Sequence, residues 1–289
     1  MKIETDKLLF NAAGVLIGLF AVGYVVSDML SVETTKVCAA RYGVSTLLPV
    51  KNAGGSLLSP IELQAMAGPR EYGMLEYAKV VPVPGGGAPA VLQIAIPQGQ
   101  AKASRSSDDA KSGIGMRWAP PEIAGATSAC LTYSAFLPAD FDFGDGGMLP
   151  GLYGGGRFDG YDRGERKSGF VTRVMWRENA IGDVTVQVPK NADRGPASLG
   201  RDRFQFKPGS WVQLEQEVVL NTPGKSDGKY RLWVDGVLRL ERDGLSWRDD
   251  AATTIEGVAG NVGFGTVEKP GQAPRASQIR LTPFELRWM

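Results

Sequence analysis

The stretch Phe170-Val171-Thr172-Arg173-Val174-Met175-Trp176-Arg177, near the middle of this 289-residue chain, alternates between a largely apolar phase and a phase that carries two arginines. The segment Val184-Thr185-Val186-Gln187-Val188-Pro189 repeats the pattern, with its three valines in one phase. Successive strand residues point to opposite faces of a sheet, so each segment predicts a half-buried strand. A glycine-rich crossing at residues 146–156 precedes both segments.

The polar phase of these two strands predicts a ligand surface. If the strands pair, one exposed sheet face presents Arg173, Arg177, Thr185 and Gln187 together. Arginine binds carboxylates bidentately, so two guanidiniums beside a hydroxyl and an amide suit an anionic ligand that is rich in hydroxyl groups. The alternative is that the arginines pair with the acidic residues of the same stretch, Glu178 and Asp183.

Strands dominate the second half of the chain. An Asp-Gly pair at residues 235–236, between two alternating runs, is a strong signal for a two-residue hairpin. Many strands separated by Gly, Pro and Asn turns, with almost no long helical period, predict an all-β antiparallel sandwich of the jelly-roll, concanavalin-like type. The further strand candidates are residues 130–137, 211–220, 230–234, 237–241 and 279–288.

Residues 8–30 form an apolar run interrupted only by Asn11, Ser27 and Asp28. About 20 such residues span a bilayer as a helix, so we expect a transmembrane anchor after a short tail of residues 1–7. A cleaved signal peptide is the alternative, although residues 21–23 are a poor cleavage site and apolar residues continue past them. The short tail favours a single-pass protein of the inner (cytoplasmic) membrane, with its large domain facing the periplasm or the cell exterior.

Gly14 and Gly18 in this run have the spacing of a membrane helix-packing motif, which would allow a homodimer or a membrane-protein partner. The simpler interpretation is the ordinary glycine content of a membrane helix.

Composition excludes several functions. The net charge of +1 argues against a nucleic-acid binder. The chain has no histidine, so proton transfer must use Tyr, Lys, Asp, Glu or Cys. Cys38 and Cys130 suit one disulfide in an exported domain, with two buried thiols as the alternative.

No metal site or cofactor is expected. Residues 140–145 carry three aspartates but lack the ligand pattern of an EF-hand, so they predict a polar turn. No helical period follows the glycines at 154–156, so these do not form a dinucleotide fingerprint. Trp211 and Trp233 could stack on sugars, but an aromatic side chain in a strand more often serves the core.

Residues 31–113 are expected to form the N-terminal part of the exported domain, with mixed strands and a short helix. Ser59 as the N-cap, Pro60 at the first helical position and Gly68 as the stop predict that helix. Strands are expected at 72–83 and 90–96, followed by a surface loop at 98–113.

Five sequence blocks in the second half of the chain form a recognisable set. They are Gly146-Gly147-Met148-Leu149-Pro150-Gly151-Leu152-Tyr153-Gly154-Gly155, Thr172-Arg173-Val174-Met175-Trp176-Arg177, Gly209-Ser210-Trp211, Val219-Leu220-Asn221-Thr222-Pro223-Gly224-Lys225-Ser226-Asp227-Gly228 and Trp233-Val234-Asp235-Gly236. In this order, over residues 114–289, they resemble polysaccharide lyase family 14 and its glucuronan-lyase relatives. The resemblance implies a β-jelly roll that cleaves uronate polymers such as alginate or glucuronan by β-elimination.

The resemblance also implies the positions of a site: Met148, Val171, Arg173, Thr185 and Gln187. In the family's pattern a lysine stands at 148, a serine at 171 and tyrosines at 185 and 187, so only the arginine is kept. β-Elimination needs a base, an acid and a group that neutralises the uronate carboxylate. Arg173 can neutralise, but an amide and a thioether do not exchange protons at neutral pH. Loss of a general acid or base typically costs about 10²–10⁴-fold in rate.

The sequence therefore predicts a membrane-anchored, extracytoplasmic domain that is catalytically impaired and serves polysaccharide synthesis, export or turnover as an accessory. It is expected to bind an acidic, uronate-containing polysaccharide through Arg173, Arg177, Tyr153, Thr185 and Gln187. One alternative is an active lyase in which Tyr153, Tyr161 or Lys167 replaces the lost groups. The other is a structural or assembly component with no affinity for glycans.

Overall fold

The structure of the protein, a computed structural model, describes residues 37–68, 72–83, 90–99, 113–155, 169–191, 195–265 and 271–289. Val37–Met289 forms one compact unit. The expected tail at 1–7 and the expected anchor at 8–30 lie outside the described residues. None of the described helices is long and apolar enough to cross a membrane.

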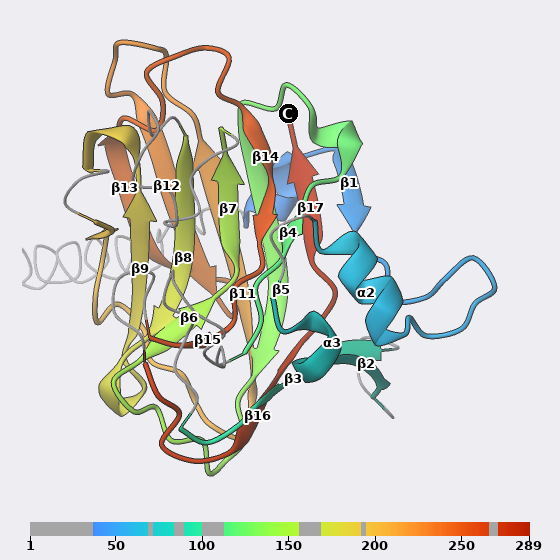
Figure 1. Cartoon of the computed structure of the whole chain (residues 1–289). Coiled ribbons are helices and arrows are strands. Elements are labelled where there is room, and N and C mark those ends of the chain that lie inside the picture. The colour runs from blue at the N-terminus through green and yellow to red at the C-terminus, as the bar shows by residue number, and fades with distance from the viewer. Residues whose placement is uncertain are drawn as a thin grey trace, which may run out of the picture. The chain divides into compact units, whose positions relative to one another are not determined.

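The larger of two antiparallel sheets has nine strands (Figure 1). Its order is β13-β12-β11-β5-β16-β3-β2, with β17 also pairing with β5 and β1 pairing with β17. Its strands are β1 (Val44–Leu47), β2 (Ala78–Pro82), β3 (Ala90–Ile96), β5 (Ser128–Phe136), β11 (Trp211–Val219), β12 (Gly228–Val234), β13 (Val237–Leu245), β16 (Ser277–Leu281) and β17 (Glu285–Trp288).

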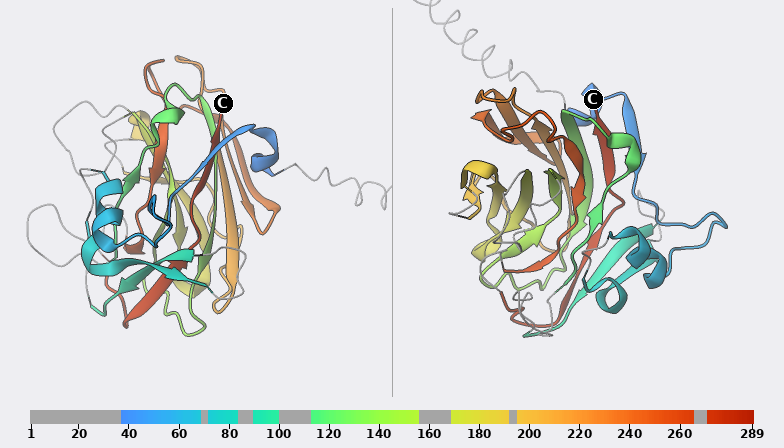
Figure 2. Two further views of the ribbon diagram at one scale, coloured as in Figure 1. Left: turned by 90° about the vertical axis from the view of Figure 1, so that its right-hand side faces the viewer. Right: turned by 45° about the horizontal axis from the view of Figure 1, so that its top comes forward.

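The second sheet has eight strands and lies against the first (Figures 1 and 2). Its order is β10-β9-β8-β7-β14-β4, with β6 pairing with β8 and with β15. Its strands are β4 (Arg117–Trp118), β6 (Gly147–Leu149), β7 (Gly151–Gly154), β8 (Phe170–Trp176), β9 (Gly182–Gln187), β10 (Ala197–Ser198), β14 (Ile255–Ala259) and β15 (Gly263–Phe264). The predicted all-β antiparallel sandwich is confirmed.

Three predictions from short sequence motifs, a capped helix, a two-residue hairpin turn and a polar turn, are confirmed. Helix α2 (Pro60–Met66) begins at Ser59, whose hydroxyl accepts from the Glu62 N–H while the Glu62 carboxylate accepts from the Ser59 N–H. Asp235 and Gly236 both have positive φ, at 51° and 75°, and they connect β12 to β13 as the predicted two-residue turn. The loop at 140–145 is a turn, in which the Asp142 carboxylate accepts from the Gly144 N–H.

Two predicted strands were wrong in part. The stretch 72–83 begins with a short helix, α3 (Met74–Tyr77), after Gly73 takes a left-handed φ of 68°, and only Ala78–Pro82 is a strand. The stretch 279–288 is broken into β16 and β17 at residues 282–284, because Pro283 cannot donate to a sheet ladder. Both pieces still pair with β5.

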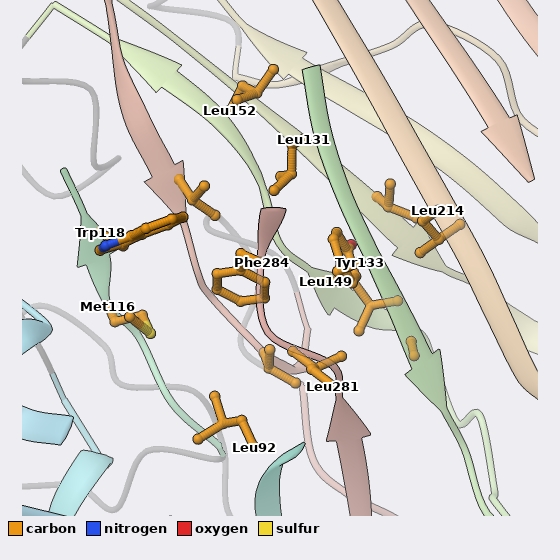
Figure 3. Close-up of a cluster of buried hydrophobic side chains, with 14 of the residues drawn as sticks. Leu92, Met116, Trp118, Leu131, Tyr133, Leu149, Leu152, Leu214, Leu281 and Phe284 are labelled. Carbon is orange, nitrogen blue, oxygen red and sulfur yellow. The ribbon is translucent and has the colours of Figure 1, made fainter. Parts of the chain in front are cut away.

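The break between β16 and β17 supplies the centre of the core. It places Phe284 between the sheets, where its ring centroid lies 5.6 Å from that of Tyr133 and 6.4 Å from that of Trp118 (Figure 3). Leucines from both sheets surround this contact, among them Leu131 and Leu214 from the nine-stranded sheet and Leu149 and Leu152 from the eight-stranded sheet.

Strands from the part of the chain expected at residues 31–113 belong to the larger sheet. β1 pairs with β17 and β3 pairs with β16, so described segments before and after residue 113 form one sheet. A disulfide between Cys38 and Cys130, 92 residues apart, ties the first described residues to β5.

Candidate functional site

The outer face of the eight-stranded sheet carries the predicted site. Along β8, Phe170, Val174 and Trp176 belong to the core between the sheets, as the alternating pattern predicted. The opposite phase of β8 points away from the core, and there Val171 packs with Tyr153 of β7 and Ala259 of β14 in a separate small cluster. The alternation in the sequence thus separates a core face from a site face.

Strand register brings the site positions together. Arg173 of β8 lies opposite Thr185 of β9, and Val171 lies opposite Gln187. On the other side of β8, Tyr153 lies opposite Val171, and Met148 of β6 lies opposite Met175. Residues opposite each other in a ladder share a face of the sheet. We call this group the site face; its members are Met148, Tyr153, Val171, Arg173, Thr185 and Gln187.

The polar side chains of the site face are buried, whereas the sequence predicted an exposed face. Arg173 is 4% exposed, Thr185 8% and Gln187 6%. The Oε1 atom of Gln187 is buried and accepts no hydrogen bond from any described residue. Most buried polar atoms have a partner, so an acceptor without one indicates a place that a donor from a ligand can fill.

Arg177 is engaged in an ion pair, which is the alternative that the sequence left open. Its Nε and Nη2 atoms donate to Asp183 Oδ2 at 3.0 and 2.7 Å. The hydroxyl of Ser198, on β10, donates to Asp183 Oδ1 at 2.7 Å. Asp183 is 1% exposed, and both of its carboxylate oxygens accept hydrogen bonds. Ligand binding by Arg177 stays a prediction.

Tyr153 is the one candidate for a relocated acid–base group that the structure places on the site face. The guanidinium of Arg117, on β4, lies 4.7 Å from the centroid of its ring. Burial raises the pKa of Tyr153 to about 12, with opposing effects from Arg117 and Glu256. The phenol therefore stays protonated at neutral pH. The other two candidates, Tyr161 and Lys167, lie outside the described residues.

Buried polar groups between the two sheets form hydrogen bonds with the glycine-rich segment that begins at residue 146. Gln216 of β11 is fully buried, and its Nε2 donates to the Pro150 carbonyl at 2.8 Å, as does the hydroxyl of Tyr133 at 2.9 Å. The Thr172 hydroxyl accepts from the Leu152 N–H at 2.9 Å and lies 3.3 Å from Gln216 Oε1.

These contacts fix the strands of the site face against the other sheet. These contacts were not predicted from the sequence, although a threonine at position 172, within the apolar phase of β8, was a usable signal. Gly151 is required in this crossing because a Cβ there would lie 2.0 Å from the Thr172 carbonyl oxygen.

The two tryptophans proposed to stack on sugars differ. Trp233 is fully buried, with the guanidinium of Arg41 5.4 Å from its ring centroid. Trp211 is 39% exposed on the outer face of the nine-stranded sheet. Neither lies on the site face.

The sequence of residues 86–280 matches the model of the family described as polysaccharide lyase 14. The chain belongs to this family. The family-14 match begins upstream of residue 114, where the resemblance was expected to start, and so takes in β3. No curated protein sequence matches the chain.

Solved structures share the family-14 fold. The PL-14 alginate lyase from Aplysia kurodai is 24% identical, with a TM-score of 0.66 over 86% of this chain and 99% of that one. The alginate lyase vAL-1 from Chlorella virus is 21% identical, with a TM-score of 0.61 over 73% of this chain and 89% of that one. A mutant of the alginate lyase Aly36B in complex with an alginate tetrasaccharide is 16% identical, with a TM-score of 0.61 over 86% of this chain and 98% of that one.

Proposed function

We propose that this family-14 domain binds an acidic, uronate-containing polysaccharide on the site face and cleaves it slowly or not at all. The observation that carries the binding proposal is the presence on one sheet face of a buried guanidinium, Arg173, and a buried amide, Gln187, whose oxygen accepts no hydrogen bond within the described part of the chain. A uronate supplies both complements, because its carboxylate accepts from a guanidinium and its hydroxyls donate to an amide oxygen. The alginate complex of Aly36B, which shares the fold, supports the same ligand class.

The case against fast turnover rests on proton transfer. Met148, Val171, Thr185 and Gln187 carry no group that titrates near neutral pH. Asp183 is held by Arg177 and Ser198, and a phenol with a pKa of about 12 is a poor base at pH 7. Among the described residues of the site face, none is suited to remove a sugar C5 proton.

The location belongs to the same proposal. Residues 8–30 anchor the protein in the inner membrane, and the domain meets the polymer in the periplasm or at the cell exterior. In that position a binding domain without fast cleavage serves polysaccharide synthesis, export or turnover as an accessory. The apolar run at 8–30 and the disulfide between Cys38 and Cys130 support this placement.

Binding and cleavage are separable in one experiment on the purified full-length protein. We expect alginate and glucuronan oligosaccharides to bind in calorimetric titrations, and Arg173→Met to weaken binding roughly 10- to 100-fold because a charge-assisted contact is lost. Arg239→Met, which alters an exposed arginine on β13, is the matched control and should leave affinity unchanged. If the wild-type protein shows an intact thermal transition and yet binds neither polymer, the binding proposal is contradicted.

The active-lyase alternative is tested in the same samples. Unsaturated uronates absorb in the ultraviolet, so their accumulation at a rate typical of an efficient enzyme would show that acid–base groups have relocated. Tyr153 is then the residue to test, because the register places it beside Val171, and Tyr153→Phe would abolish that rate.

A further inference from the structure

A cavity lies on the outer face of the nine-stranded sheet, on the far side of the sandwich from the site face. Its volume is about 720 Å³, within the range of about 300–1,000 Å³ that is common for small-molecule sites. Strands β5, β11 and β17 form its floor, and residues 47–51, at the end of β1 and directly after it, form one wall. The function proposed above makes no use of this cavity.

The floor offers hydrogen-bonding groups that the fold does not use. Ser134 and Gln213 lie opposite each other in the pairing of β5 with β11, and both line the cavity. Their backbone groups form hydrogen bonds within the sheet and its turns, but neither the Ser134 hydroxyl nor the Gln213 side-chain amide bonds to any described residue. A hydroxyl and an amide side by side can both donate to and accept from sugar hydroxyls.

Trp211 provides an aromatic surface at one end of the cavity. It is 39% exposed, while its ring centroid lies 5.4 Å from that of Phe136, its partner in the strand register. The Arg280 guanidinium, 5.9 Å from the centroid of the Phe136 ring, adds a further contact to this aromatic pair. A tryptophan held in place with part of its surface open provides apolar contact area at low entropic cost.

The charges that line the cavity balance. Among the described residues of the lining, Lys51 and Glu285 are the two that carry charge, one of each sign, and Glu285 also pairs with Arg287. The lining of this cavity, as described, has no arginine to hold a carboxylate, in contrast to the site face. The rest of the lining is mostly apolar, including Leu48 and Val91, with Thr132 and Thr282 as further polar residues.

We propose that this cavity is a second carbohydrate site, which binds a neutral oligosaccharide with one pyranose ring on Trp211 and its hydroxyls on Ser134 and Gln213. It does not depend on the function proposed for the site face. Two sites on opposite faces of one domain allow the protein to hold an uncharged glycan while the site face engages a uronate polymer.

The test compares two ligand classes against two variants of the full-length protein. The neutral probes are cello-, manno-, malto- and N-acetylchito-hexaose, and the acidic probe is an alginate hexasaccharide. We expect at least one neutral probe to bind the wild type, and Trp211→Ala to weaken that binding roughly tenfold while leaving alginate binding unchanged. Arg173→Met should do the reverse. Gln213→Ala should weaken the neutral probe by a smaller factor.

Ile61→Ala is the matched control, because Ile61 is an apolar residue 72% exposed on α2 and does not line the cavity. Thermal transitions of all variants establish that they are folded. The proposal is overturned if no neutral probe binds at millimolar concentration, or if a folded Trp211→Ala variant binds it as the wild type does. Alginate binding that falls with Trp211→Ala would also overturn it, because the cavity would then take the acidic polymer.

Discussion

The outer faces of the two sheets both bury charged or polar side chains, and they differ in how those side chains are satisfied. On the nine-stranded sheet, Glu215 and Glu217 of β11 are 4% and 3% exposed. They lie under residues 37–42, which we call the N-terminal strap. On the eight-stranded sheet, Arg173 and Gln187 are equally buried on the site face.

Under the strap every carboxylate has partners. Glu217 accepts from the Tyr42 hydroxyl at 2.9 Å and pairs with Arg41 at 2.6 Å and Arg231 at 3.0 Å. Glu215 accepts from the Ala39 N–H at 3.0 Å. Burial raises the pKa of Glu215, and the contacts with Ala39 and Thr132 oppose that rise.

The difference separates a structural cluster from a binding surface. A buried polar group whose partners all come from the chain contributes to the fold, whereas a buried acceptor without a donor, like Gln187 Oε1, destabilises the empty protein. Substitutions under the strap should therefore lower stability, and a substitution at Gln187 should raise it while weakening binding.

The largest effect should come from the disulfide that fixes the strap. The bridge closes a loop across 92 residues, for which the reduced chain entropy of the cross-linked unfolded state predicts a stabilisation of about 4.6 kcal/mol. We expect Cys38→Ser with Cys130→Ser to lower the melting temperature by roughly 10 °C. Addition of a reductant should reproduce the shift in the wild type and leave the double variant unchanged. A shift of less than about 2 °C would mean that the strap stays docked without the bridge.

An intermediate effect is expected at Glu217. Its removal leaves Arg41 and Tyr42 of the strap and Arg231 of β12 without their common acceptor. Breaking a buried ion pair costs about 3–5 kcal/mol. Because Arg41 is partly exposed, we expect the low end, about 3 kcal/mol, for Glu217→Ala in denaturant unfolding. Glu241→Ala removes the more exposed partner of Arg231 and should cost less than about 1 kcal/mol. Equal costs would show that the cluster behaves as an ordinary surface network.

The smallest effect should have the opposite sign. Gln187→Met keeps the length of the side chain and removes the acceptor that lacks a donor, so we expect the free energy of unfolding to rise by about 1 kcal/mol. Alginate oligosaccharide affinity should fall in the same variant. Thr185→Val, on the same strand and face, is the control for loss of a side-chain polar group. A destabilised Gln187→Met protein would show that the amide has a structural role, and the contrast between the two faces would fail.

Much of the fold was predictable because its signals are local. Period-two alternation located β3, β5, β8, β9, β11 and β12 to within two residues, and the Asp235-Gly236 pair located the hairpin. Errors arose where a tertiary contact overrode the local pattern. Pro283 broke one predicted strand so that Phe284 could enter the core, and the helical turn after Gly73 replaced the start of another.

The sequence predicted which residues share the site face, but it did not predict that their side chains are buried. Alternation assigned Arg173, Thr185 and Gln187 to one face, and the register of β8 with β9 brought them together. Their burial could not be read from the sequence, because exposure depends on what lies over a face and not on the strand itself. The pairing of Arg177 with Asp183 was one of two possibilities that the sequence left open, and the turn between β8 and β9 decides it by bringing the two side chains together.

The sequence by itself determined the strand pattern, the family and the residue types available for chemistry, since each depends on the order of residues along the chain. Only the tertiary structure decided which polar groups find partners. Gln216 lies more than 60 residues from the Pro150 carbonyl that it binds, and Glu217 lies far from Tyr42. Contacts at such separations depend on how the two sheets and the strap pack, and they distinguish the satisfied cluster under the strap from the unfilled acceptor on the site face.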